Sequence, residues 1–313
     1  SNSGSDPRLA VKLFTWSTLG SDQSWFNAAA IATLSQFCSS GATCLSASDK
    51  AAAAGQNLVN FLRGDRSNEG PSTDISKYYR QRSHVLGDIV SSEAVYVKAP
   101  QFNYTDAGYS SFKGSMSSRT GMVYVGANDG MLHAFDSSTG QETWAYVPSM
   151  VLPNMYKLAD KAYSTNHQYL VDGTPTQGDV YFGGSWHTIL VGGLAGGGRG
   201  YYALDVTDPA TPVALWEFTY DTTKGSGYTT DANLGMAYGK PEIVKLKNGT
   251  WVVIVTSGYN NVSPGDGKGY VFALNAQTGA KVTTVSTGTG STASPSGLAQ
   301  IRSWVDNSDS DNT

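Results

Sequence analysis

The sequence contains few charged residues. Asp, Glu, Lys and Arg make up 15% of its 313 residues, against about 25% in an ordinary soluble domain. Its 21 Lys and Arg residues are scattered, and the formal net charge is −4. Because binding to DNA or RNA requires a basic face, we expect no nucleic-acid partner.

Long apolar runs are also missing. No stretch reaches the roughly 20 apolar residues that an α-helix needs to cross a bilayer. The opening letters "SNSGSD" do not have the basic and apolar regions of a signal peptide. We therefore expect a soluble segment with no direct membrane span, whose export signal or membrane anchor was lost or never present.

Cysteine is nearly absent, with only Cys38 and Cys44 in the stretch "CSSGATC". No histidine stands near either one, so a metal site is not expected there. Two interpretations remain, a local disulfide in an exported protein or two unpaired small core residues. The polar spacer favours the disulfide.

Catalytic motifs are missing as well. None of the four histidines, His84, His133, His167 and His187, stands beside a Ser or Cys in a nucleophile motif. His133 and His187 fall in predicted strands and are expected to be packed or edge residues. The run "GGLAGGGRG" at 192–200 has no following Lys-Ser/Thr and leads into a strand, so it is not a phosphate loop. We expect no enzyme.

Glycine, by contrast, is abundant, with 36 residues, which indicates many turns and a mainly β fold. Three stretches share one pattern of an apolar strand, a Gly-rich connection, a strand ending in Ala, an apolar residue and Asp or Asn, and a polar turn. They are residues 123–144, 189–216 and 252–282. The closing residues Asp136, Asp205 and Asn275 are 69 and 70 positions apart.

A further strand is predicted before each of these stretches, at 86–97, 172–182 and 239–247, and a fourth such start at 294–305. A four-stranded unit that recurs with fixed positions is typical of propeller blades. We predict a partial β-propeller over residues 87–313, with three blades and the start of a fourth. The Asp or Asn side chains are expected to bond backbone amides in the turns that follow.

Residues 1–86 have a different composition and are predicted to form a small helical segment beside the propeller. A strand is expected at 9–16 and helices at 24–37 and 48–64. Ser48 is the expected N-cap of the second helix, and Gly64 its C-terminal stop.

The blade sequence "VYVGANDGMLHAFDSSTGQETW" at 123–144 resembles the repeats of quinoprotein propellers. That resemblance raises an alternative function, a pyrroloquinoline quinone dehydrogenase or a periplasmic scaffold. Such enzymes hold the cofactor on the axis of a complete ring, whereas this chain has at most four blade starts. It also lacks the adjacent Cys–Cys pair that many of them place against the cofactor. The repeat therefore indicates the structural scaffold and is weak evidence for the dehydrogenase reaction.

Longer motifs are similar to the C-terminal propeller of the PilY/PilC family of type IV pilus proteins. They occur in order at 62–65, 80–97, 121–136, 172–209 and 269–279. The resemblance implies an exported protein at the pilus tip on the cell surface, acting in pilus assembly, retraction control, twitching motility and surface attachment. It implies minor pilins and the pilus fibre as partners, together with a host-cell surface.

The same resemblance implies a calcium site in an Asp-rich loop. The tail "DNSDSDNT" at 306–313 places Asn307, Asp309 and Asp311 at alternating positions, as a hard cation such as Ca²⁺ prefers. A second register uses Asp306, Ser308 and Ser310. The alternative is a solvated acidic terminus. The closing acid of the family's loop is missing here, so weak binding is expected.

Some members of the family are associated with integrin binding through an Arg-Gly-Asp triplet. Arg63, Gly64 and Asp65 form such a triplet and are a cell-attachment candidate. The alternative is structural, because Gly64 can cap a helix and Asp65 can bond the turn after it.

Overall fold

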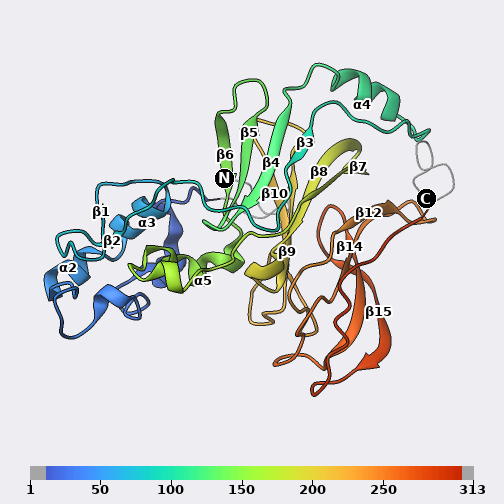
Figure 1. Ribbon diagram of the computed structural model, residues 1–313. Helices are drawn as coiled ribbons and strands as arrows, with labels where there is room; N and C mark the ends of the chain where they lie inside the picture. The colour runs from blue at the N-terminus through green and yellow to red at the C-terminus, as the bar shows by residue number, and fades with distance from the viewer. Residues whose placement is uncertain (1–11, 305–313) are drawn as a thin grey trace.

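Three β-sheets follow one another along the chain in the computed structural model, which describes residues 12–304. In each sheet the neighbouring strands are consecutive in the sequence and, with one exception, antiparallel. The sheets lie side by side as green, yellow and orange arrows in Figure 1. The predicted blades are therefore confirmed, and the described part of the chain forms an open array of blades and not a closed ring.

The strands have the following bounds. The first sheet contains β3 (Val95–Val97), β4 (Met122–Ala127), β5 (Met131–Asp136) and β6 (Glu142–Tyr146). The second contains β7 (Thr176–Phe182), β8 (Ser185–Gly193), β9 (Gly200–Asp205), β10 (Val213–Thr219) and β11 (Tyr228–Thr230). Strand β11 is the exception and pairs with β10 in parallel. The third contains β12 (Glu242–Lys245), β13 (Trp251–Thr256), β14 (Lys268–Asn275) and β15 (Lys281–Gly290).

The repeated Asp or Asn closes the third strand of every blade, as predicted. Asp136 Oδ1 accepts hydrogen bonds from the backbone N–H groups of Ser138 and Thr139, at 2.8 and 3.1 Å. Asp205 and Asn275 accept the same kind of bond at the ends of β9 and β14. A short side-chain acceptor at this position fixes the turn locally, which explains why the motif recurs once per blade.

Large side chains join the second blade to the third. The rings of Phe218 and Phe272 meet edge to face, 5.1 Å apart. Trp216 donates from Nε1 to the backbone oxygen of Ala276 at 3.0 Å. A Cβ at Gly279 would lie 2.6 Å from Trp216 Cγ, so only glycine lets the turn after β14 approach this indole. Aromatic packing of this kind is the usual way in which neighbouring sheets bury their faces.

The predicted first strand of a fourth blade is wrong within the described residues. The part of 294–305 that the structure describes contains only an isolated bridge, between Gly258 and Leu298. Thr256 Oγ1 donates to the backbone oxygen of Ala299 at 2.7 Å. The described part of this segment therefore bonds to the end of β13 and the residues that follow it, and does not form a strand.

The N-terminal part contains short helices in place of the longer ones predicted. They are α1 (Trp16–Leu19), the 3₁₀ segments η1 (Gly20–Phe26) and η2 (Ser35–Phe37), α2 (Ala47–Ala52) and α3 (Gln56–Leu62), with a minimal parallel pair β1 (Glu69–Gly70) and β2 (Tyr79–Arg80). None of the helices within residues 12–304 has both the length and the hydrophobicity of a membrane span.

Three N-terminal predictions need correction, and each has a local cause. The described part of 9–16 is not a strand, because Thr15 starts a turn that leads into α1. Helix 24–37 is interrupted at Asn27, whose side chain accepts from the backbone of Ala30 and competes with helical hydrogen bonds. Helix 48–64 is split at Gly55, which has φ 66°, and its N-cap is Ser46.

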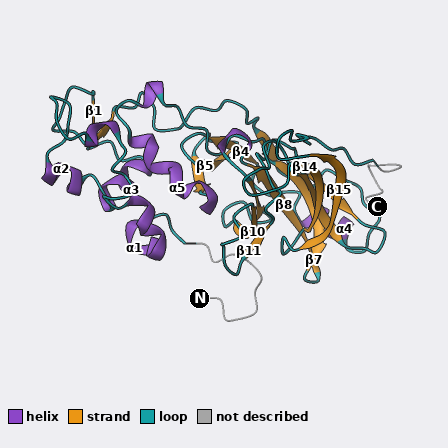
Figure 2. Ribbon diagram, turned by 90° about the horizontal axis from the view of Figure 1, so that it is seen from below, coloured by secondary structure: helices purple, strands orange, loops and turns teal. Residues whose placement is uncertain are grey.

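The hydrophobic core continues across the predicted boundary at residues 86 and 87. One cluster of buried side chains includes Phe26 and Phe61 from the N-terminal part and Leu132 from β5. The segment between β6 and β7 adds further short helices to this cluster: η3 (Ser149–Val151), α5 (Leu152–Met155), η4 (Tyr156–Ala159) and η5 (Tyr163–Thr165). Figure 2 shows the helices at one end of the molecule and the strands at the other. Two further helices lie among the strands, α4 (Tyr109–Ser115) and η6 (Ala195–Gly197).

Candidate functional site

The Arg63-Gly64-Asp65 triplet lies at the C-terminal end of α3. Arg63 is the C-cap residue, and Gly64, with φ 112°, turns the chain out of the helix. Asp65 Oδ1 accepts from the backbone N–H of Ser67 at 2.8 Å, and this bonding lowers the pKa of the Asp65 carboxyl. The structural roles considered for Gly64 and Asp65 are thus both present. The side chains of Arg63 and Asp65 are exposed to solvent.

The backbone of Asp65 is also held by a buried side chain, that of Arg82. Its backbone oxygen accepts from Arg82 Nη2 at 3.2 Å. The same guanidinium is 2.5 Å from Glu69 and lies 3.9 Å above the ring of Phe61. Arg82 is 6% exposed, so a buried ion pair supports the turn that carries the triplet, in addition to the exposed bond between Asp65 and Ser67.

Arg63 also lines a cavity of about 410 Å³ between the N-terminal part and the first blade. Val85 and Leu86 are among its lining residues, as are the acids Asp129 and Glu142. Of the triplet, Arg63 is therefore part of a recess at this junction. The sequence does not predict the recess, because its lining comes from segments as far apart as Phe14 and Val147.

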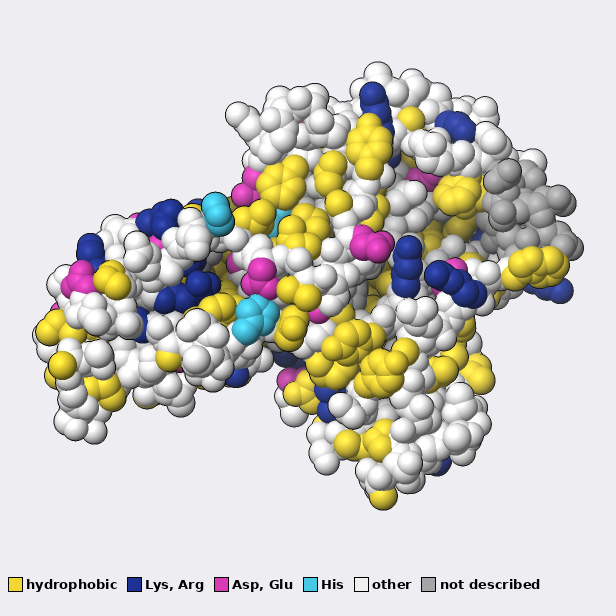
Figure 3. Space-filling model, viewed as in Figure 1, with side chains coloured by type: hydrophobic (Ala, Val, Ile, Leu, Met, Phe, Trp, Pro, Cys, Tyr) yellow, Lys and Arg dark blue, Asp and Glu magenta, His cyan; other side chains and the backbone are white. Residues whose placement is uncertain are grey.

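The junction itself is clamped by the turn that joins β4 to β5. Gly87 N–H donates to Asp129 Oδ2 at 2.7 Å, and Asn128 Nδ2 donates to Asp88 Oδ2 at 3.0 Å. His167 Nε2 is 2.8 Å from the same oxygen of Asp88. Burial acts to raise the pKa of the Asp88 carboxyl, but these hydrogen bonds lower it below its ordinary value. In Figure 3, histidine side chains are visible where the helical part meets the sheets.

His133 is packed, as the sequence analysis expects, between two carboxylates. Its Nε2 is 3.1 Å from Asp129 and its Nδ1 is 3.2 Å from Glu142. Burial acts to lower the pKa of the imidazole, but the hydrogen bond and charge of Asp129, together with Glu142, raise it above its ordinary value. His187 is also packed, with its ring stacked 3.9 Å from that of Phe182.

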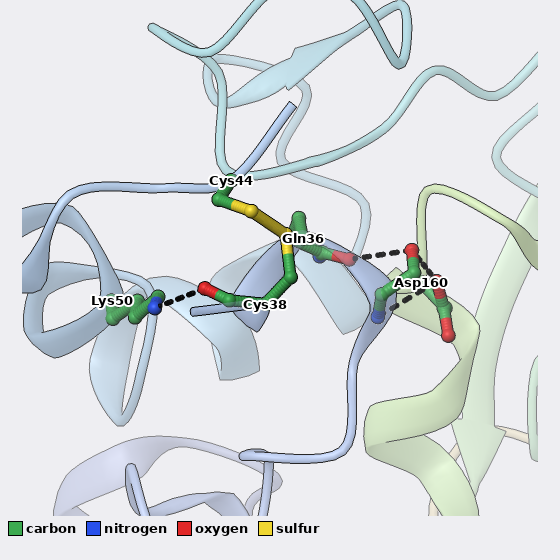
Figure 4. Close-up of a disulfide and its surroundings, with 6 residues drawn as sticks. Gln36, Cys38, Cys44, Lys50 and Asp160 are labelled. Carbon is green, nitrogen blue, oxygen red and sulfur yellow. Dashed lines mark hydrogen bonds between the residues drawn. A yellow bond between two sulfur atoms is a disulfide. The ribbon is translucent and has the colours of Figure 1, made fainter. Parts of the chain in front are cut away.

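Cys38 and Cys44 are bonded to each other in the structure, with their Cα atoms 5.2 Å apart (Figure 4). Lys50 Nζ donates to the backbone oxygen of Cys38 at 2.6 Å. Nearby, the buried Gln36 accepts at Oε1 from the backbone N–H of Lys161 at 3.2 Å. Residues 39–43, between the two cysteines, are all exposed. The bond from Lys50 to Cys38 attaches the start of this loop to the helical part.

The predicted calcium ligands Asn307, Asp309 and Asp311 lie outside the described residues. Within residues 12–304, no group of three or more His, Cys, Asp or Glu side chains is arranged to hold a metal ion. The metal site therefore stays a prediction from the sequence.

Sequence reasoning missed the role of Arg199, in the "GGLAGGGRG" run. Its guanidinium donates to the backbone oxygens of Leu234, Pro264 and Ala232, at 2.7, 2.9 and 3.2 Å, and lies 4.2 Å from the ring of Tyr220. A Cβ at the neighbouring Gly197 would meet another backbone oxygen at 1.7 Å. The run therefore packs closely against other backbone at its glycines. Through Arg199 it also bonds to the segments before β12 and after β13, which connects the second blade to the third. A lone arginine among glycines was the only signal available.

Comparisons with known proteins agree with this architecture. A family model described as the PilY1 beta-propeller domain matches residues 86–313. Type IV pilus biogenesis factor PilY1 of Pseudomonas aeruginosa strain PAK is 41% identical over 269 residues, which cover 83% of this chain and 22% of that protein. A PilY1 homolog of Xylella fastidiosa strain Temecula1 is 41% identical over 220 residues, covering 68% of this chain and 17% of that protein.

A solved structure is also similar. The crystal structure of the Pseudomonas aeruginosa PilY1 C-terminal domain superposes with a TM-score of 0.53 at 36% identity, covering 68% of this chain and 41% of the solved chain. This chain thus spans about a fifth of the length of the curated relatives that it matches.

Proposed function

Because the chain belongs to the PilY1 β-propeller family of type IV pilus biogenesis factors, we propose that it is a binding and assembly module of a pilus-associated protein. In this proposal the whole protein is exported to the cell surface and lies at the pilus tip. There it contacts the minor pilins and the pilus fibre, promotes pilus assembly, opposes retraction and supports twitching motility and attachment. The family is one of biogenesis factors and not of enzymes, so the quinone-dependent dehydrogenase alternative is set aside.

The match of the family model to residues 86–313 carries the proposal. Deletion of the coding sequence in the source bacterium should abolish surface pili and twitching, and expression of the full-length protein should restore both. Deletion in a strain that cannot retract pili separates assembly from retraction, because pili should reappear there if the protein opposes retraction. Unchanged piliation and twitching after deletion would contradict the proposal.

The calcium site at Asn307, Asp309 and Asp311 is part of this proposal. Its support is the donor set, since carboxylate and amide oxygens at alternating loop positions are the ligands that Ca²⁺ prefers. Calorimetric titration of a chain extended beyond Thr313 should show calcium binding, and Asp309→Ala/Asp311→Ala should remove it. Equal binding by the double variant would exclude these residues as ligands.

Cell attachment through Arg63, Gly64 and Asp65 is proposed with integrin as the host partner. Its support is the exposure of the two charged side chains at a turn that a buried ion pair holds. Asp65→Glu should abolish integrin-dependent attachment and leave the thermal midpoint nearly unchanged. Asp208→Glu is a matched control, because Asp208 is another exposed aspartate that accepts from the backbone N–H two residues on. Attachment unaffected by Asp65→Glu would leave the triplet with only its structural role.

A further inference from the structure

A second cavity lies between the N-terminal part and the first two blades, and it shares Phe14, Ala145 and Val147 with the recess beside Arg63. Its volume is about 420 Å³, which is within the range of small-molecule and side-chain sites. Its lining includes Leu13 and Phe14 from the N-terminal part, Trp144 on β6 and Ala214 on β10. Most of the surface is therefore apolar, and it is formed by segments that only the fold brings together.

One wall of this cavity contains a buried carboxylate. Glu217, on β10, is 2% exposed. Its Oε1 accepts from Tyr146 Oη at 2.8 Å and from Ser149 N at 2.7 Å, while Oε2 accepts from Ser149 Oγ at 2.5 Å. A carboxylate has about four acceptor positions, so Oε2 keeps one that these three donors do not use.

Glu217 also lacks a direct positive partner. Among residues 12–304, no Lys, Arg or His nitrogen lies within salt-bridge distance of its carboxylate. Lys224 acts on it only at longer range. Burial raises the pKa of the Glu217 carboxyl above its ordinary value, although the hydrogen bonds from Ser149 and Tyr146 act to lower it. A cation that entered the cavity would favour the ionised form and bond to it.

The other charged groups of the cavity agree with a positive ligand. Asp22 adds a second carboxylate to the lining, and Lys12 is the one lysine among the lining residues that the structure describes. Trp144 and Tyr228 contribute aromatic side chains, which attract cations through their ring faces. Two acids, four aromatic side chains and further apolar residues fit a ligand with a positive end and an apolar stem.

We propose that this cavity binds a primary ammonium group on an unbranched apolar stem, supplied by a lysine side chain of a partner polypeptide. The stem lies along the apolar walls and the ammonium donates to Oε2 of Glu217. This inference is independent of the pilus function proposed above, because it rests only on the cavity and its charges.

The test uses the full 313-residue chain and three probes of similar size, hexylammonium, 1-hexanol and hexanoate, titrated by saturation-transfer NMR. A charge-assisted hydrogen bond should make hexylammonium bind about 10- to 100-fold more tightly than 1-hexanol. Hexanoate should bind worst, because it brings a second negative charge to Glu217. N-acetyl-lysine methylamide tests the polypeptide source, and it should compete with hexylammonium.

Variants locate the site. Glu217→Gln should remove the preference for hexylammonium over 1-hexanol while 1-hexanol still binds, which also shows that the cavity remains folded. Ala214→Leu, which fills the cavity without touching the carboxylate, should weaken both probes. Glu142→Gln is the control, because this acid lines the other cavity, and it should change neither.

Two results would overturn the inference. One is equal binding of hexylammonium and 1-hexanol by the wild-type chain, or a hexylammonium preference that persists in Glu217→Gln, since either would show that the carboxylate does not select the ligand. The other is hexylammonium binding without competition by N-acetyl-lysine methylamide, which would exclude the lysine side chain as the source of the amine.

Discussion

Replacing Arg199 by methionine should destabilise the contact between the second and third blades. The change keeps an apolar stem of similar length and removes the guanidinium. Three backbone oxygens, those of Ala232, Leu234 and Pro264, then lose a donor at 3.2 Å or less. The carbonyls of Ala232 and Leu234 precede β12, and that of Pro264 follows β13. The Arg199 side chain therefore connects two segments that are separate in the sequence.

The expected cost follows from these bonds. Hydrogen bonds to a charged group each contribute about 1.5–3 kcal/mol, so three that were lost outright would cost roughly 5–9 kcal/mol. Arg199 is half-buried, so water replaces part of this bonding after the substitution. We therefore expect the free energy of unfolding to fall by about 2–4 kcal/mol.

Urea unfolding followed by tryptophan fluorescence measures this cost. Arg302→Met is the matched control, because the Arg302 side chain is 70% exposed and has one ion pair, with Glu242, and it should change stability by less than about 0.5 kcal/mol. Hydrogen exchange should become faster in residues 231–234 and 258–267 of Arg199→Met. Equal stability of the two variants, with unchanged exchange in these segments, would refute the reasoning.

Two further predictions concern the Cys38–Cys44 disulfide and the protonation of His133. Mass spectrometry of the native chain without reductant should find no alkylatable thiol at Cys38 or Cys44. The double serine variant should lose on the order of 2–3 kcal/mol of stability. Two free thiols in the native chain would contradict the disulfide. The raised pKa of His133 means that its protonation adds stability below its ordinary pKa of 6.5, which is lost as the pH rises through the folded value. The stability difference between the wild type and His133→Gln should therefore shrink as the pH rises from below 6.5 through the raised folded pKa, and a constant difference would argue against the pairing with Asp129 and Glu142.

Features that depend on neighbouring residues were predictable from the sequence, but the points at which one residue interrupts a regular pattern were not. The repeated Asp or Asn identified the end of the third strand in all three blades, because that side chain bonds within its own turn. The helix predicted at 48–64 had the right apolar edge, with Leu58, Phe61 and Leu62 buried, but Gly55 divides it. Helical spacing alone did not show that a residue with positive φ breaks the run.

The candidate sites divide in the same way. The triplet and the cysteine pair were visible in the sequence, since each needs only neighbouring residues. The recess beside Arg63 and the anion at Glu217 were not, because their walls and partners come from distant segments. The carboxylate of Glu217 is buried by contacts from β6 and the turn after it, and an isolated strand sequence contains no sign of them.

The sequence by itself determined the period of the blades, the turns that end their third strands, and the family, because these depend on residues a few positions apart. Only the tertiary structure decided how the blades hold one another and where charge is buried. Arg199 reaches carbonyls 33 to 65 positions away in the chain, and Glu217 meets Ser149 across 68. Hydrogen bonds over such separations depend on the packed positions of whole sheets, which no short pattern of residues encodes.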